Sequence, residues 1–352
     1  METNVNFGTY TPRKEDVKKT DPRRYVLVAG LDYHDFWSFK TPYIQDIKNN
    51  VLSKVQPEEE TAFYIIDILV GKIELIEYKG KERLGSTITE FDPVNASNYV
   101  DHRFTSNGKN IISKKDIYKL VEGIGNNYPG KLQEMHVFSH ALYDGPILVD
   151  SNEYINGPSG AQYNTDDHDM RMSDIKNNIL NSSLFSKAFS KDGVVKIWGC
   201  NASSHFNNLI KQVMKKQNYK SDGTTADSSV FSINDVTFYG AKISDYIKQV
   251  TTPPIVKNGL FNISMKELKK VLAIYTNYTY AAWLANKANL KVHAALPGTY
   301  AEFSNPKKFR ISNDTKGNIG FYKTYLKVNI DDLHYGIYDS PTVQNLISIS
   351  KA

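Results

Sequence analysis

The sequence of 352 residues contains a single cysteine, Cys200, so no intrachain disulfide can hold the fold together. No apolar stretch approaches the roughly 20 residues that a helix needs to cross a bilayer, so no membrane span is predicted. Residues 1–24 are polar and charged and lack the apolar core of a cleavable leader. The protein is therefore predicted to be cytoplasmic, or exported without a cleavable signal peptide.

The chain also lacks a block of charge of one sign. It has 43 Lys and Arg against 38 Asp and Glu, a formal net charge of +5, and these residues are scattered rather than gathered in a run. No nucleic acid partner is expected, because nucleic-acid binding usually needs a basic patch or stripe. The hydrophobic content of 40% is enough for a sizeable core, either in one large α/β domain or in two smaller ones.

The one cysteine stands where an apolar run meets a helical pattern. Residues 194–198 are typical of a buried strand, and Ser203 or Ser204 is the expected N-cap of the helix that follows. Apolar residues then recur with the period of one helix face, at Phe206, Leu209, Ile210, Val213 and Met214. A thiol just before a helix N-terminus lies near unpaired N–H groups, which lower its pKa and favour the thiolate. This placement suits a reactive cysteine, although a lone cysteine can also be a small buried hydrophobe.

A base for this thiol is predicted at His140, which ends the strand-like run of residues 132–140. One helical pattern separates His140 from Cys200, and its apolar face consists of Met172, Ile175, Ile179 and Leu180. A strand, a helix and a second strand form a βαβ unit, whose two strands are parallel and commonly adjacent. Catalytic groups collect at the carboxyl ends of such strands. His140 and Cys200 are therefore predicted to converge, with a structural histidine as the alternative.

The order of these two residues resembles the caspase-like cysteine peptidases, a group that includes caspases, gingipains, clostripain and CHAT domains. In that family a histidine and then a cysteine each end a parallel strand, as His140 and Cys200 are expected to do about 60 residues apart. A glycine closely follows the family's histidine, and Gly145 follows here. Trp198-Gly199-Cys200 stands where caspases have Gln-Ala-Cys. The resemblance extends over roughly residues 22 to 300 in the order of elements.

This resemblance implies a cysteine endopeptidase that hydrolyses peptide bonds through a thioester intermediate. Cys200 would attack the carbonyl, and His140 would protonate the leaving amine and then activate water. The N–H of Cys200 and one near Gly145 would hold the oxyanion. No third carboxylate is required, so the pair is expected to act as a His/Cys dyad.

Substrate-binding residues are expected in the loops at the same edge of the sheet. A first strand at residues 25–29 precedes one such loop, and a short strand at residues 292–296 precedes another. The expected oxyanion and substrate contacts are Asp32, Tyr33, Trp37, Asp144, Gly145 and Thr299. The predicted partner is a protein or peptide substrate, and the oligomeric state is left open.

No cofactor and no metal site are predicted, with calcium as the alternative. The polar loop of residues 150–170 contains the run Asp166-Asp167-His168-Asp169, whose hard oxygen atoms suit Ca²⁺, although the EF-hand spacing is absent. Some caspase-like peptidases do use calcium. A loop of this length is usually functional, so it could cover the cleft or be cut during maturation.

These patterns predict an α/β fold with a mostly parallel sheet flanked by helices and small β-hairpin excursions near residues 71–110 and 308–340. Residues 1–22 are expected to be a flexible N-terminal segment, and residues 23–305 the caspase-like α/β domain. Residues 306–352 are expected to form a C-terminal β-hairpin and short helix packed on it. Two alternatives to the peptidase stay open: a toxin-like amide hydrolase with the same dyad, and a non-catalytic caspase-like interaction module.

Overall fold

The computed structural model describes residues 21–32, 37–39, 43–100, 103–150, 168–305 and 308–352, and this part of the chain is built around a nine-stranded sheet. From one edge to the other the strands are β20 (Asn329–Ile330), β21 (Gly336–Tyr338), β17 (Lys291–Ala294), β12 (Phe189–Trp198), β9 (Leu132–Phe138), β1 (Arg23–Ala29), β4 (Glu60–Asp67), β5 (Lys72–Lys79) and β6 (Glu82–Glu90). The strands from β17 to β4 are parallel, and those at both edges are antiparallel. The predicted α/β class with a mostly parallel sheet is confirmed.

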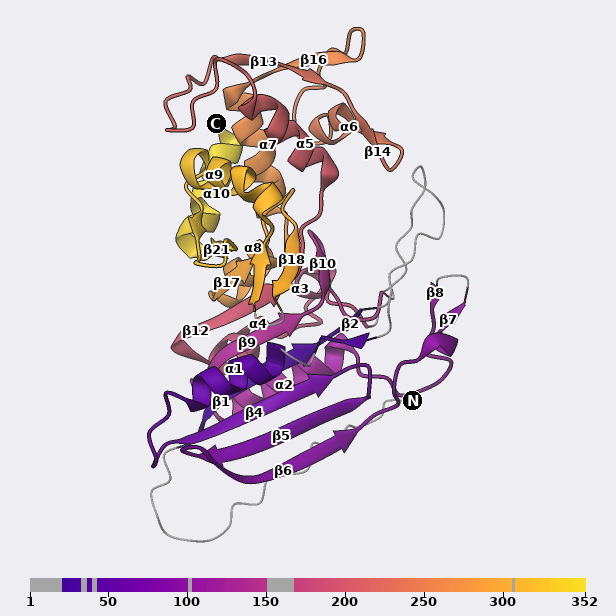
Figure 1. Ribbon diagram of the computed structural model, residues 1–352, viewed down its shortest axis with the longest axis vertical. Helices are drawn as coiled ribbons and strands as arrows, with labels where there is room; N and C mark the ends of the chain where they lie inside the picture. The colour runs from indigo at the N-terminus through magenta and orange to yellow at the C-terminus, as the bar shows by residue number, and fades with distance from the viewer. Residues whose placement is uncertain (1–20, 33–36, 40–42, 101–102, 151–167, 306–307) are drawn as a thin grey trace.

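Helices lie on both faces of the sheet (Figure 1). The larger core involves α2 (Lys114–Asn127), α4 (Ser182–Ala188), α5 (Ser204–Met214), α6 (Ile243–Ile247), α7 (Met265–Asn277), α8 (Tyr280–Ala288) and α10 (Ser340–Lys351). The smaller core lies beneath α1 (Tyr43–Leu52). In β1, Val26 and Val28 face the larger core, whereas Leu27 and Ala29 face the smaller one, because successive strand side chains point to opposite faces. Burial on both faces explains the continuous apolar run of β1, whereas Glu134, His136 and Lys196 interrupt the apolar residues of β9 and β12.

Short two-stranded sheets lie outside the main sheet. They pair β2 (Leu31–Asp32) with β3 (Trp37–Ser38), β7 (Tyr99–Val100) with β8 (Arg103–Phe104), β10 (His140–Leu142) with β11 (Gly145–Ile147), β13 (Val230–Asn234) with β16 (Leu260–Ser264), β14 (Thr237–Phe238) with β15 (Ala241–Lys242), and β18 (Ala301–Asn305) with β19 (Lys308–Ile311). Two of them, β2–β3 and β10–β11, directly follow parallel strands of the main sheet. They therefore surround the carboxyl edge where the site is predicted.

The crossover between β9 and β12 differs from the expected single helix. It contains two short helices, α3 (Met172–Lys176) and α4, and Ile179 between them is 41% exposed rather than part of a buried face. The break falls at Asn178, whose φ of 55° lies in the left-handed region that asparagine tolerates. The crossover still returns the chain to a parallel strand, as predicted.

The C-terminal segment does contain an antiparallel pair, β20 with β21, but its strands lie later in the chain than residues 308–311. The strand β19 pairs back with β18, and residues 316–325, within the expected β excursion of residues 308–340, form the helix α9 (Lys316–Tyr325). The aromatic residues Phe321, Tyr322 and Tyr325 suggested a strand, but they pack against the larger core from a helix. The strands β20 and β21 then extend the main sheet, and α10 confirms the predicted terminal helix.

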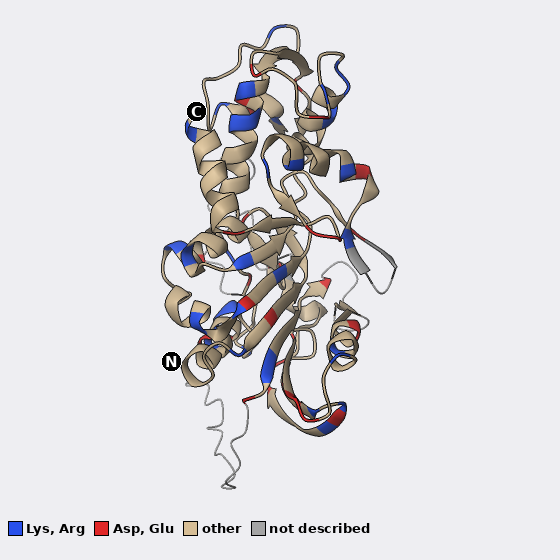
Figure 2. Ribbon diagram, turned by 90° about the vertical axis from the view of Figure 1, so that its left-hand side faces the viewer, with Lys and Arg blue, Asp and Glu red and all other residues tan. Residues whose placement is uncertain are grey.

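The surface agrees with the scattered charges of the sequence. On the side drawn in Figure 2, Lys and Arg are interspersed with Asp and Glu rather than gathered in one field. Within the described ranges, no helix combines the length and the apolar character required to traverse a bilayer.

Candidate active site

His140 and Cys200 directly follow two adjacent parallel strands, β9 and β12. The strands β9 and β12 pair so that Phe138 is opposite Trp198, and each predicted catalytic residue comes two positions after that pair. Residues two apart along a strand share a face, and Phe138 and Trp198 both belong to the smaller core. The predicted adjacency of the two strands is therefore confirmed, and it brings both residues to the carboxyl edge of the sheet.

A carboxylate accompanies His140. Its Nε2 atom lies 3.5 Å from Oδ1 of Asp32, and the imidazole meets the ring of Phe39 edge-on at 5.7 Å. The other oxygen of Asp32 accepts a hydrogen bond of 3.1 Å from the indole N–H of Trp37. Asp32 was expected to contact substrate and the pair to act without a third group, but the structure places its carboxylate beside the imidazole. Tyr33 lies outside the described residues.

The thiol of Cys200 is half-buried and contacts the start of β18. The backbone N–H of Ala301 donates to its sulfur at 3.1 Å. Burial raises the pKa of the Cys200 thiol, and the hydrogen bond from Ala301 lowers it by less. The expected lowering of this pKa is wrong, because α5 begins four residues later, at Ser204, and loss of hydration dominates.

Thr299 positions the turn that carries Cys200. Its carbonyl accepts the N–H of Asn201 at 3.0 Å, and the carbonyl of Asn201 accepts the N–H of Gly298 at 2.9 Å. The hydroxyl of Thr299 donates to the carbonyl of Leu296 at 2.7 Å, and the residue is fully buried. Its side chain is thus engaged inside the protein rather than presented to a substrate.

Gly145 borders a small cavity beside Cys200. This cavity, of about 20 Å³, is lined by both residues and has room for a single water molecule. Gly145 has a φ of 146°, and an added Cβ would lie 2.1 Å from the carbonyl oxygen of Met170, so only glycine fits. The neighbouring Asp144 is half-buried, and burial raises the pKa of its carboxyl group.

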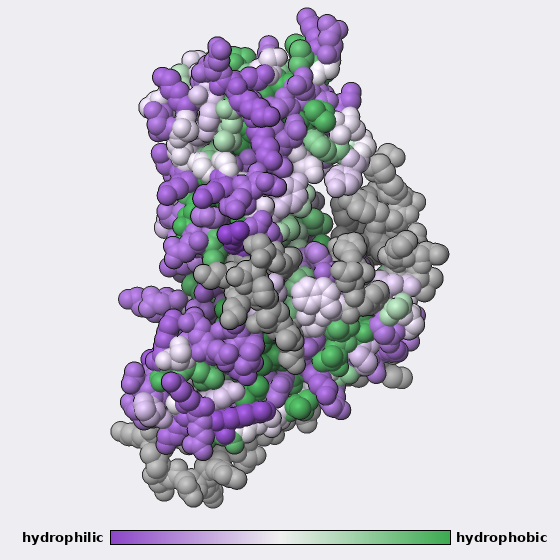
Figure 3. Space-filling view, in the orientation of Figure 1, coloured by the Kyte–Doolittle hydropathy of each residue, from purple (hydrophilic) through white to green (hydrophobic). Residues whose placement is uncertain are grey.

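Two apolar side chains extend from this cavity to the surface. Leu142 and Tyr143, at the tip of the β10–β11 hairpin, line the cavity and are 44% and 46% exposed. Figure 3 shows apolar residues at the surface in the middle of the molecule, over β10. A substrate that reaches Cys200 would therefore pass an apolar surface.

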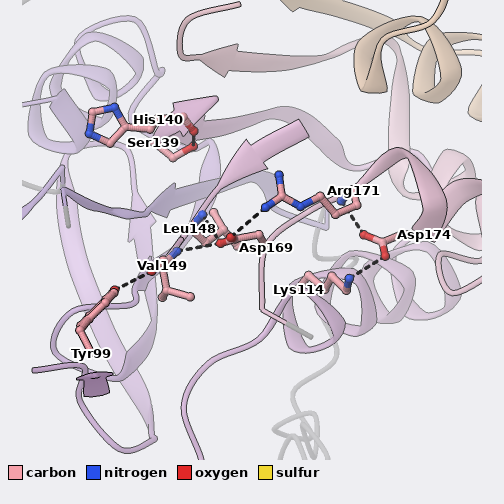
Figure 4. Close-up of polar contacts among 9 residues, drawn as sticks. All are labelled: Tyr99, Lys114, Ser139, His140, Leu148, Val149, Asp169, Arg171 and Asp174. Atoms are coloured by element: carbon pink, nitrogen blue, oxygen red, sulfur yellow. Dashed lines mark hydrogen bonds and ion pairs between the residues drawn. The ribbon is translucent and has the colours of Figure 1, made fainter. Parts of the chain in front are cut away.

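A buried ionic network lies next to the β10–β11 hairpin (Figure 4). Lys114 and Asp174 form an ion pair of 2.7 Å, with side chains that are 3% and 0% exposed. Asp169 accepts the N–H groups of Leu148 and Val149 at 2.6 and 2.8 Å and pairs with Arg171 at 3.1 Å. The backbone N–H of Arg171 in turn donates to Asp174 at 2.8 Å.

The same network bears on the calcium alternative. The carboxylate of Asp169 is occupied by backbone N–H groups and by Arg171, which leaves little of it for a cation. His168 packs edge-on against Phe104 at 4.9 Å, and Asp166 and Asp167 lie outside the described residues. Among the residues that the structure does describe, no cluster of three His, Cys, Asp or Glu could hold a metal ion.

A second polar chain lies along β9 and β12, further from their carboxyl ends. The indole N–H of Trp198 donates to Nδ1 of His136 at 2.9 Å, so the opposite ring nitrogen carries the proton and donates to Glu134 at 2.6 Å. Lys196 pairs with the same carboxylate at 3.1 Å. Burial alone would raise the pKa of Glu134, but His136 and Lys196 outweigh it and lower this pKa to about 2.

This chain predicts that acid destabilises the protein in two stages. Burial lowers the pKa of His136 from 6.5, so its contribution to stability is lost as the pH falls through that value. The contribution of Glu134 is complete above pH 4.5 and is lost as the pH falls from there towards 2. Replacement of Glu134 by glutamine is expected to cost roughly 2–3 kcal/mol of unfolding free energy at pH 7.

Urea denaturation of wild type and Glu134→Gln at a series of pH values tests this prediction. The curves of unfolding free energy against pH should converge below pH 4.5, because the variant has no carboxyl group to titrate there. Parallel curves over the whole range would contradict it.

Several contacts of the candidate site were not apparent from the sequence. The Asp32–His140 pair, the Ala301 N–H on the sulfur and the buried network each join residues far apart in the chain, and no local motif marks them. The geometry is nonetheless specific, since a histidine with a carboxylate partner and a thiol with a backbone donor end neighbouring strands. Comparison of this chain with protein-family models, curated proteins and solved structures found no match.

Proposed function

We propose that this protein is a cysteine endopeptidase in which His140 and Cys200 hydrolyse a peptide bond. The observation that carries the proposal is that these residues follow the paired carboxyl ends of the adjacent parallel strands β9 and β12, each two positions after the pair of Phe138 and Trp198. Such an edge is where open α/β sheets place reactive groups. The carboxylate of Asp32, next to His140, supports a histidine that takes up a proton.

In the proposed reaction the thiol begins protonated, because burial raises its pKa. His140 takes this proton as the sulfur attacks the carbonyl carbon, and Asp32 stabilises the imidazolium that forms. The C–N bond then breaks, and the proton passes from His140 to the leaving amine. Water attacks the resulting thioester with His140 as base, and the departing sulfur regains a proton.

The exposed apolar side chains of Leu142 and Tyr143 suggest the kind of substrate. Because they extend from the cavity beside Cys200, a peptide bound there would place an uncharged side chain against them. A toxin-like hydrolase acting on another amide would use the same groups.

One observation favours a second candidate, a non-catalytic interaction module of the same fold. The pKa of Cys200 is raised rather than lowered, as is typical of structural cysteines. In that case the sheet edge would be a binding platform and Cys200 a small half-buried side chain.

Alkylation with iodoacetamide at neutral pH separates these two candidates. Since Cys200 is the one cysteine of the chain, every cysteine adduct found by mass spectrometry reports this site. We expect labelling of the native protein and a roughly tenfold slower rate in His140→Ala, which removes the base. His205→Ala is the matched control, because the His205 ring contacts the carbonyl of Ala241 instead. Labelling only after denaturation would sink the peptidase proposal.

A further inference from the structure

Tyr335 carries a buried hydroxyl group that makes no hydrogen bond within the described residues. The residue is fully buried between β20 and β21, and among the described residues its hydroxyl has no hydrogen-bond partner. An unpaired buried hydroxyl costs free energy, and a phenylalanine would fill the same space without that cost. Tyr322, which is also fully buried, avoids this cost because its hydroxyl donates to the carbonyl of Pro297 at 2.8 Å. Because the hydroxyl of Tyr335 does not stabilise the fold, its presence suggests a role in another state of the protein.

The position of Tyr335 points to the Cys200 site. Its ring meets the indole of Trp198 edge-on, with centroids 5.1 Å apart, and Trp198 precedes Cys200 by two positions. Tyr335 and Trp198 belong to the same smaller core, as does Phe39, which contacts His140. Negative charge on Cys200 also contributes to raising the pKa of Tyr335, after burial itself, so the phenol stays protonated when the thiol ionises.

The backbone around Tyr335 is fixed independently of its hydroxyl. Its N–H donates to a carboxylate oxygen of Asp331 at 2.9 Å, and its carbonyl accepts the N–H of Asp331 at 2.9 Å. The preceding residue, His334, has a φ of 71°. A strained non-glycine residue is maintained only where its surroundings hold it. The ring is thus placed by the turn and by Trp198.

We propose that the Tyr335 hydroxyl is the hydrogen-bond donor reserved for the negative sulfur of Cys200. While the thiol of Cys200 is protonated, its sulfur is a poor hydrogen-bond acceptor, so the hydroxyl of Tyr335 makes no hydrogen bond to it. Once the proton has moved to His140, the thiolate accepts from Tyr335 on one side and from the N–H of Ala301 on the other. This role rests on the proposed function, because it stabilises the nucleophile of that reaction in an otherwise apolar pocket.

Other ionisable groups lie near the Tyr335 hydroxyl or near His140. They are His140 itself, at the start of β10, Asp32 on β2, Tyr43 on α1 and Asp331 before β21, with His293 of β17 bonded to Asp331 at 2.8 Å. Replacing Tyr335 by phenylalanine leaves all of them in place. It also preserves the N–H that Asp331 accepts, so a change in the titration of Cys200 reports the lost hydroxyl.

The test is an NMR titration of full-length protein labelled with ¹³C at cysteine Cβ, which gives a single signal from Cys200. In Tyr335→Phe the pKa of Cys200 is expected to rise by about one unit, a tenfold loss of thiolate at a given pH. The urea midpoint should stay equal to that of wild type or increase. Tyr322→Phe, the matched control, should lower the midpoint and leave the pKa of Cys200 unchanged.

Two outcomes would overturn the proposal. One is a Tyr335→Phe variant whose Cys200 titrates as in wild type. The other is a fall in its urea midpoint like that of Tyr322→Phe, which would make the hydroxyl a structural group. Neither readout involves a peptide substrate, so failure of the peptidase assignment would show separately, as an absence of hydrolysis in a protein whose thiol still titrates.

Discussion

Replacement of Cys200 by serine is expected to lower kcat/KM for peptide hydrolysis by on the order of 10⁴-fold or more. A serine hydroxyl is far harder to ionise than a thiol, and the environment of Cys200 already disfavours charge. His140→Ala should cause a loss of similar size, since each residue depends on the other and the two losses are not additive. Hydrolysis of an unbiased peptide library, followed by mass spectrometry, measures both.

The control for this experiment is Ser203→Ala, three residues further along the chain. Ser203 is the N-cap of α5 but makes no side-chain capping hydrogen bond, so its loss should change kcat/KM by less than about threefold.

Asp32→Asn distinguishes a His/Cys dyad from a triad that includes Asp32, because an amide cannot stabilise the imidazolium. Equal hydrolysis by Cys200→Ser and wild type would contradict the proposed nucleophile.

The second large effect concerns stability. Lys114→Met is expected to lower the free energy of unfolding by roughly 3–5 kcal/mol, because it leaves the carboxylate of Asp174 buried without its cation. The matched control is Lys248→Met, which breaks an ion pair with Asp245 whose side chains are 54% and 37% exposed. That change should cost less than about 1 kcal/mol. Urea denaturation at pH 7 gives both values.

A double variant sharpens the stability test. Lys114→Met with Asp174→Leu removes both charges of the pair, so the double variant should be more stable than Lys114→Met alone. The single variant should also loosen the hairpin that borders Cys200, since the N–H of Met172 donates to the carbonyl of Asp144 at 2.8 Å. Equal losses of unfolding free energy in Lys114→Met and Lys248→Met would show that the buried network does not stabilise the hairpin beside Cys200.

The elements that the sequence predicted well are those specified by neighbours along the chain. The strand β1 is an apolar run buried on both faces, and the helix α7 begins at a capping box of Ser264 with Glu267, which is a sequence-local signal. Local signals failed where packing decided. The strand β6 is exposed along nearly all of its length, so it has no apolar alternation to reveal it. Residues 316–325 carry aromatic side chains that favour a strand but form a helix against the core.

The candidate site shows the same division. The adjacency of the strands that precede His140 and Cys200 followed from a βαβ unit, which is a local pattern. The electrostatic environment of Cys200 did not, since it depends on Ala301 and on the apolar residues around the sulfur. The helix-dipole argument considered the next few residues only, whereas burial depends on chain segments that are distant in sequence.

The two edge strands of the main sheet bear on whether the protein aggregates at high concentration. An uncovered strand offers free backbone groups to a second molecule and can start edge-to-edge aggregation. Here one border strand, β20, has only two residues, and the other, β6, bears Glu82, Arg83 and Glu90 and has an irregular register with β5. Short length at one border and charge at the other both discourage intermolecular pairing, so the sheet resists growth into fibres from either side.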